Sequence, residues 1–163
     1  SRRAKAFGNV YAENDNVGPS ETAASIAKLG KGKIAAVYFD CGITYNTCRT
    51  TVLRDFLNDL VKELFPKPTV EVEGSHLVDV SVMTKDGKLC VNLVNTAGTH
   101  ANADYQTYDE IPPVGPLAIT IRTKKPKAIR RRPGNRKLKF TYAKGEAKLT
   151  IPRLEIHDII VVE

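Results

Sequence analysis

The hydrophobic pattern of this chain changes its period near Pro66-Lys67-Pro68. Upstream of these prolines, apolar residues recur at spacings of one, three and four, which is the period of an amphipathic helix. Downstream, apolar and polar residues alternate, as they do in strands that bury one face. The pattern predicts a mainly β chain: a strand–strand–helix α/β segment over residues 1–67, with two or three strands and one helix, followed by a small antiparallel β-sandwich over residues 68–163.

Two strands are predicted in the first segment, over residues 22–29 and 33–40. Gly30-Lys31-Gly32 joins them, and its glycines permit the positive φ angles of a tight turn. The second strand is almost continuously apolar from Ile34 to Phe39. Strands of this kind are usually covered on both faces, so we expect other segments of the protein, for example helices, to pack on both sides of the hairpin.

A helix is predicted next, with Asn46 or Thr47 as its N-cap and Pro66 as its stop. Its apolar residues form a single stripe: Val52, Leu53, Phe56, Leu57, Leu60, Val61 and Leu64. Full burial of each large side chain is worth about 1.5–3 kcal/mol, so we expect this stripe to lie on a sheet.

The strongest local prediction downstream is a β-hairpin over residues 76–95. Val78, Val80 and Val82 share one face of its first strand, and Asp86-Gly87 is a favoured two-residue turn. Further strands are predicted over residues 117–123, 127–132, 137–143, 147–151 and 154–162. Many short strands with regular turns between them indicate a β-sandwich.

A long connection over residues 96–116 separates the hairpin from the later strands. Long loops in compact domains are often functional, and a Greek-key sandwich also needs a crossover between its sheets. The two explanations are compatible. The candidate carbohydrate contacts in this loop are His100, Asp104, Tyr105 and Tyr108, because tyrosine rings stack on the apolar face of a sugar.

The sequence shows no catalytic constellation. A nucleophile needs a base within reach, and the surroundings of Cys41 (FDCGITYN) are unlike a nucleophile elbow. His76, His100 and His157 each lack a second histidine at metal-ligand spacing. We therefore expect no metal, no cofactor and no enzymatic activity for this chain alone.

Cys41, Cys48 and Cys90 form an odd set without CxxC spacing, which argues against a disulfide scaffold and against a zinc site. Idle or buried thiols are expected, and a Cys41–Cys48 bridge stays open as an alternative. The longest apolar run is too short to span a membrane, and the first residues lack the apolar segment of a signal peptide. We expect no membrane partner.

The net charge is +7, and a segment over residues 124–139 carries basic residues without an acidic one. An alternative function is therefore polyanion binding, to nucleic acid or a heparin-like polymer, with Arg130, Arg131 and Arg132 as contacts. Adjacent residues of a strand face opposite ways, so these arginines cannot form one uniform stripe. The only aromatic residues near the segment are Phe140, which follows it directly, and Tyr142 just beyond, so nucleic acid is not favoured as the partner.

Four strings of the sequence carry a resemblance: AASIAKLGKGKIAAVYFDCG, VKELFPKP, KLCVNLVN and IPPVGPLAITIR. With them the chain resembles the C-terminal region of large bacterial glycoside hydrolase-like proteins of the β-galactosidase-like type. Such proteins join a catalytic barrel to an amidotransferase-like α/β domain and then to a terminal β-sandwich. The strings are structural, so the resemblance assigns no catalytic residue.

The resemblance implies that residues 1–67 are the tail of an amidotransferase-like domain and that the chain is cut from a longer polypeptide. The expected function is that of a non-catalytic accessory region of a glycoside hydrolase, with a structural or oligomerisation role and contact with carbohydrate. The implied partners are an upstream catalytic barrel of the same polypeptide and a second copy of the chain. The implied location is periplasmic or extracellular if the parent is a glycosidase, and cytoplasmic otherwise.

Overall fold

The structure is a computed structural model that describes residues 4–12, 17–48, 50–98 and 110–163. The chain is mainly β, as predicted, and its sheets are antiparallel. It divides into two compact units, Ser1–Lys67 and Pro68–Glu163. Among the described residues, no helix is both long enough and apolar enough to cross a membrane.

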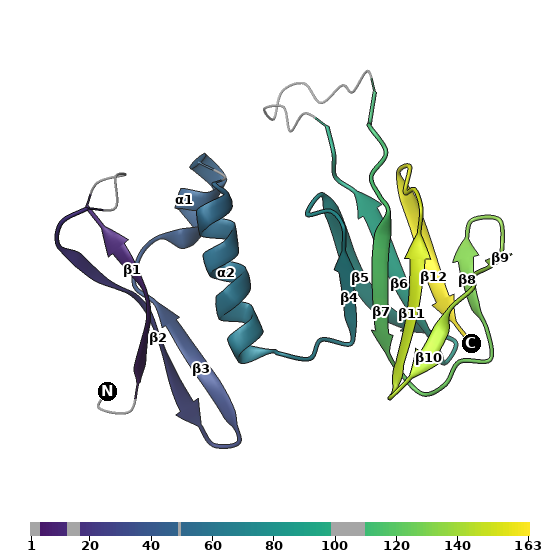
Figure 1. Cartoon of the computed structure of the whole chain (residues 1–163), viewed down its shortest axis with the longest axis horizontal. Helices are drawn as coiled ribbons and strands as arrows, with labels where there is room; N and C mark the ends of the chain where they lie inside the picture. Colours follow the sequence, from purple (N-terminus) through teal and green to yellow (C-terminus); the bar gives the residue numbers. More distant parts are fainter. Residues whose placement is uncertain (1–3, 13–16, 49, 99–109) are drawn as a thin grey trace. The chain divides into compact units, whose positions relative to one another are not determined.

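The first unit contains a three-stranded sheet in the order β1-β2-β3, formed by β1 (Lys5–Tyr11), β2 (Ser20–Leu29) and β3 (Gly32–Val37) (Figure 1). The predicted hairpin is confirmed as β2 and β3, and Gly30 in its turn has a φ of +57°. The first strand pairs with β2 and was not delimited by the sequence pattern.

Two helices follow the sheet, α1 (Cys41–Cys48) and α2 (Thr51–Leu64). The cap of α2 is Thr50, whose hydroxyl accepts a hydrogen bond from Leu53 N at 3.4 Å. The prediction of Asn46 or Thr47 as N-cap was therefore wrong. Both residues belong to the separate short helix α1, and a threonine just before the apolar stripe provides the cap.

Helix α2 covers one face of the small sheet. Leu53 and Leu60 are buried, and the Phe56 ring lies 5.6 Å from Phe7 and 5.8 Å from Phe39 between ring centroids. The stripe is only partly covered, because Val52, Val61 and Leu64 at its flanks are exposed.

The other face of β3 is open among the described residues. Ile34 is 51% exposed, and Tyr38, just after the strand, is 61% exposed. The expected cover on both faces of this strand was therefore wrong for the chain as described. A single amphipathic helix with one apolar stripe covers only one side of a sheet.

The second unit is a β-sandwich of two sheets, with strand orders β10-β11-β7-β4 and β5-β6-β12-β8-β9 (Figure 1). Its strands are β4 (Val70–Glu73), β5 (Val78–Lys85), β6 (Lys88–Asn95), β7 (Leu117–Arg122), β8 (Ile129–Arg132), β9 (Arg136–Lys137), β10 (Thr141–Ala143), β11 (Glu146–Ile151) and β12 (His157–Val162). The core between the sheets is aliphatic, with Leu93, Ile119, Ile129, Leu149 and Ile160 almost fully buried.

Three details of the sandwich differ from the predicted strands. Residues 137–143 split into β9 and β10, because the chain passes there from one sheet to the other. Strand β4 is not among the predicted strands. Val82, on the edge strand β5, is 44% exposed, whereas Val78 and Val80 pack against the core as predicted.

Candidate functional site

The four candidate carbohydrate contacts, His100, Asp104, Tyr105 and Tyr108, lie outside the described residues. Their contact with carbohydrate stays a prediction. The strands on either side of their loop belong to different sheets, β6 to the five-stranded one and β7 to the four-stranded one. The connection is therefore a crossover of the sandwich.

The two ends of this crossover are joined by Asn95, the last residue of β6, which is 6% exposed. Its Nδ2 donates to Pro112 O at 2.9 Å and to Glu155 O at 2.7 Å. Its Oδ1 accepts from Ala97 N at 2.9 Å. One buried amide thus links residues near both ends of the connection, Ala97 and Pro112, to the turn that precedes β12.

The predicted arginine contacts lie on β8 and do not form one cationic surface. Arg130 Nε lies 3.1 Å from Glu163 Oε2. Arg131 Nη2 lies 2.7 Å from Oδ2 of Asp158, whose carboxylate is buried; the contact is an ion pair without hydrogen-bond alignment. Only Arg132 is exposed with no partner among the described residues.

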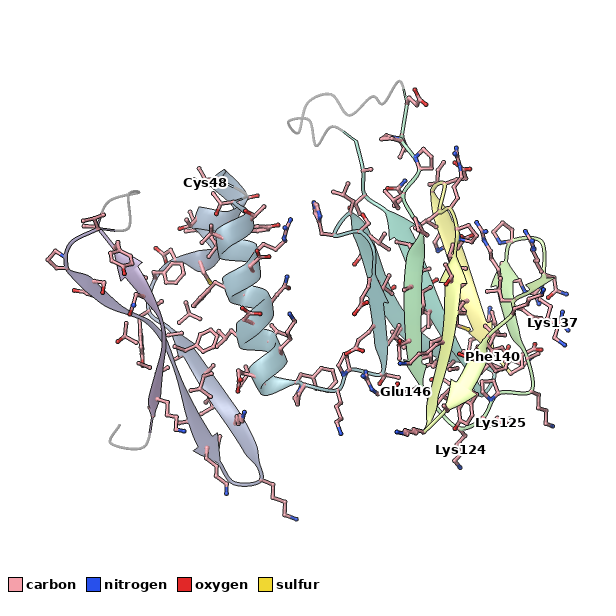
Figure 2. The ribbon with its side chains drawn as sticks, in the orientation of Figure 1. Cys48, Lys124, Lys125, Lys137, Phe140 and Glu146 are labelled. Atoms are coloured by element: carbon pink, nitrogen blue, oxygen red, sulfur yellow. The ribbon has the colours of Figure 1, made fainter. Side chains whose placement is uncertain are left out.

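The rest of the basic segment is divided between two places. Lys124, Lys125 and Lys127 lie in the connection from β7 to β8, while Lys137 lies on the edge strand β9. In Figure 2, the labelled Lys124 and Lys125 lie at the lower end of the sandwich, away from Lys137. The segment is continuous in sequence but not on the surface.

The carboxylate of Glu163 contacts two basic side chains. Its Oε1 lies 2.8 Å from Lys88 Nζ, and its Oε2 accepts from Arg130. Hydrogen bonds from Lys88, and then from Arg130, hold the pKa of the Glu163 carboxyl below its ordinary value. The charged form of Glu163 is therefore favoured by folding.

We expect Glu163→Gln to lower stability at pH 7 and to have less effect in acid. Because the pKa of Glu163 is lower in the folded state, its contribution is present above the unfolded pKa and is lost as pH falls through the folded pKa. Urea unfolding at pH 7 and pH 3, followed by circular dichroism, measures the difference. Glu73→Gln on β4 is the control, since Glu73 is exposed and has no ion-pair partner among the described residues. An equal loss at both pH values for Glu163→Gln would contradict the assignment.

A second ion-pair network joins three strands of the four-stranded sheet. Arg122 on β7 contacts Glu71 on β4 at 2.9 Å and Glu146 on β11 at 3.3 Å. Lys148 Nζ also lies 3.2 Å from Glu146. The hydrogen bond to Glu71 is the main cause of the raised pKa of Arg122. Every member has a partner of opposite charge, which is typical of a structural network.

Two concave regions are candidates for a ligand site. One, of about 740 Å³, lies in the first unit, and Phe7, Ile26 and Leu64 contribute apolar surface to it beside several lysines. There Lys33 Nζ is 2.9 Å from Glu63 Oε2. The other, of about 640 Å³, lies on the four-stranded sheet of the sandwich. Neither lining contains a histidine or a cysteine, so neither assembles a nucleophile with a histidine base.

The structure agrees with the expected free thiols. All three cysteines are free. Cys41 and Cys48 begin and end α1, and seven helical residues rise roughly 10 Å, too far for a disulfide. His157 is exposed while the adjacent Asp158 is buried, so the two face opposite ways. Among the described residues, no group of three or more His, Cys, Asp or Glu side chains is placed to hold a metal ion.

No protein-family model matches this chain, and a search of curated proteins finds no match. A solved structure that it resembles is the α-L-fucosidase isoenzyme 2 from Paenibacillus thiaminolyticus, at a TM-score of 0.69 and 15% sequence identity. The similarity covers 97% of this chain and 25% of the fucosidase chain. The chain thus spans about a quarter of the length of that glycoside hydrolase, and at this identity the similarity establishes a shared fold.

Proposed function

We propose that this chain is a non-catalytic accessory region of a glycoside hydrolase whose catalytic domain lies elsewhere in the same polypeptide. The carrying observation is the structural similarity to the α-L-fucosidase, which includes both units of this chain but only a quarter of the fucosidase. A fold supports many functions, so the proposal depends also on what the residues of this chain do and do not assemble.

The uncovered apolar surface of the first unit supports this proposal. Val52 is 77% exposed, Val61 is 57% exposed and Phe65 is 58% exposed, and Ile34 on β3 is also open. Large exposed apolar side chains on one small unit are typical of a surface that packs against more protein. We propose that the remainder of the parent polypeptide, or a second copy of the chain, covers them.

The sandwich supports a bracing role rather than a chemical one. Its core is a closed aliphatic layer, and Arg122, Arg131 and Glu163 are each paired with a side chain of opposite charge. A catalytic site needs a group left available to react, with a pKa suited to its task. We propose that the sandwich stabilises the catalytic domain and that the loop over residues 96–116 contributes carbohydrate contacts.

The sequence resemblance and the structural neighbour point to different sugars as the substrate of the parent protein. The sequence resemblance favours a β-galactosidase-like parent, whereas the structural neighbour is an α-L-fucosidase. Both are glycosidases, so we propose glycoside hydrolysis as the parent reaction and make the choice of sugar an outcome of the test.

We expect the full-length polypeptide to cleave an aryl glycoside and residues 1–163 alone to show no turnover above buffer. The complete open reading frame that encodes this chain is sequenced first, and we expect it to encode a glycosidase domain. Both proteins are then assayed on p-nitrophenyl α-L-fucoside and p-nitrophenyl β-D-galactoside. Turnover by this chain alone, or a reading frame without a glycosidase domain, would refute the proposal.

Polyanion binding through Arg130, Arg131 and Arg132 has less support. Two of these guanidinium groups are paired with carboxylates, and breaking a pair to bind a ligand cancels much of the gain. A site on β8 would rely on Arg132 alone.

A further inference from the structure

Five lysines converge on one end of the sandwich from three loops that are far apart in the sequence. They are Lys85, Lys124, Lys125, Lys127 and Lys144, and together we call them the lysine end. Lys124 and Lys125 lie there in Figure 2. The hydrogen bonds that follow bring the three loops together.

Two of the loops meet at the start of β11. Thr123 N donates to Gly145 O at 3.0 Å, which brings the residue after Thr123, Lys124, next to Lys144. Lys144 has a φ of +50° and Gly145 a φ of +83°, so the two form the tight turn between β10 and β11.

The third loop reaches the same end through Glu163. Lys127 N donates to Glu163 O at 2.6 Å, and Lys88 Nζ contacts the Glu163 carboxylate. Lys85 is the register partner of Lys88 across the Asp86-Gly87 turn. The hairpin turn of β5 and β6 and the connection that carries Lys127 therefore flank the end of β12, one on each side.

The lysine end has a local excess of positive charge. The nearby carboxylates of Glu146 and Glu163 are already paired, the first with Arg122 and Lys148 and the second with Lys88 and Arg130. Asp86 is the remaining acid of these three loops. All five lysines are exposed, and none has an ion-pair partner among the described residues.

Unpaired ammonium groups suit an anionic polymer better than the paired arginines do. A ligand that binds at the lysine end would break no existing ion pair, so its binding free energy is not reduced by the loss of such a pair. Clustered charge of one sign also attracts an oppositely charged polymer over a distance comparable with the Debye length.

The chemistry of this end favours a polysaccharide over a nucleic acid. Single-stranded nucleic acid binds largely by stacking bases on aromatic rings. The aromatic residues beside these loops are not available for stacking: Tyr142 and Phe140 pack against the core, and Tyr142 Oη donates to Thr123 O. Lysines act as separate point charges and suit dispersed sulfate or carboxylate groups.

We infer that the lysine end is a binding site for an acidic polysaccharide, one that carries uronate or sulfate groups. The choice of a polysaccharide as the ligand rests in part on the proposed function. The excess of positive charge at the lysine end is independent of that proposal. The site lies on the sandwich and uses none of the three arginines that the sequence singled out.

The test measures binding of the full chain to immobilised heparin and polygalacturonate, with a neutral glycan and duplex and single-stranded DNA as further probes. Lys124→Gln/Lys125→Gln/Lys144→Gln is compared with Arg132→Gln/Arg136→Gln/Lys137→Gln, which removes the same charge at the β8–β9 edge. Circular dichroism melting checks that both variants are folded. We expect the lysine variant to bind at least about tenfold more weakly and with a shallower salt dependence, and the control to keep its affinity within about twofold.

Three results would overturn the inference. They are the absence of binding to both acidic polysaccharides, an equal loss in the two variants, and tighter binding of either DNA than of the polysaccharides. The last would identify a nucleic-acid surface instead. These binding measurements need no catalysis. An open reading frame without a glycosidase domain would refute the proposed function but would not decide whether the lysine end binds a polysaccharide. A failure to bind would refute the inference about the lysine end but not the proposed function.

Discussion

Gly74→Ala is expected to destabilise the sandwich by about 2–5 kcal/mol, from backbone strain and overpacking together. Gly74 follows β4 and has a φ of +112°, a conformation that side chains rarely adopt. A Cβ atom there would overlap Pro116 O, a backbone atom that cannot move aside without shifting β7. Urea unfolding measures the loss, and hydrogen exchange of the β4 and β7 amides locates it.

Gly87→Ala is the matched control for this substitution. Gly87 also has a positive φ, of +71°, but nothing lies within 4 Å of a Cβ built there. Its cost should be limited to the left-handed conformation, about 1–2 kcal/mol. If both alanine variants lose the same stability, the close approach of Gly74 to Pro116 is not what requires glycine.

Asn95→Ala is expected to cost about 2–4 kcal/mol. The substitution removes the amide that serves Pro112 O, Glu155 O and Ala97 N. The Ala97 N–H is buried, and a buried backbone group left unsatisfied costs about 1–3 kcal/mol, to which the two lost, partly buried bonds add. Because these groups flank the crossover, the amides of residues 97 and 114 should also exchange faster. Thermal and urea unfolding give the magnitude.

The same strand offers the control. Asn92 lies three residues earlier in β6, and its Nδ2 is buried without a hydrogen-bond partner among the described residues. Asn92→Ala removes no hydrogen bond to the described chain and relieves an unsatisfied donor, so we expect a change below about 1 kcal/mol. A loss at position 92 as large as that at position 95 would show that generic packing, rather than the hydrogen bonds of Asn95, explains both.

The local elements were predictable where one short segment contains the whole cause. Asp86-Gly87 predicts its own hairpin because both residues adopt positive φ angles, of +50° and +71°, in the turn. The apolar stripe of α2 predicts a helix that lies on a sheet, and Leu53 and Leu60 do so. The predicted sandwich follows from alternation, which places Leu93 and Ile160 in its core.

The predictions that were wrong concern features that depend on residues far away in the sequence. Whether Ile34 is covered depends on how much protein packs on β3, which its apolar neighbours in sequence do not reveal. The split of residues 137–143 depends on which sheet each end joins. Thr50, rather than Asn46 or Thr47, caps α2 because several polar residues compete locally for that position.

Electrostatics shows the same division. By itself the sequence determined the hairpins, the helix, the aliphatic core and the excess of basic residues, because each follows from local periodicity or composition. Only the tertiary structure decided which charges are available: Arg130 and Arg131 meet Glu163 and Asp158 across neighbouring strands, whereas Lys144 joins Lys124 at one end of the sandwich. The physical reason is that an ion pair depends on distance in space, and strand pairing brings together residues that the sequence holds far apart.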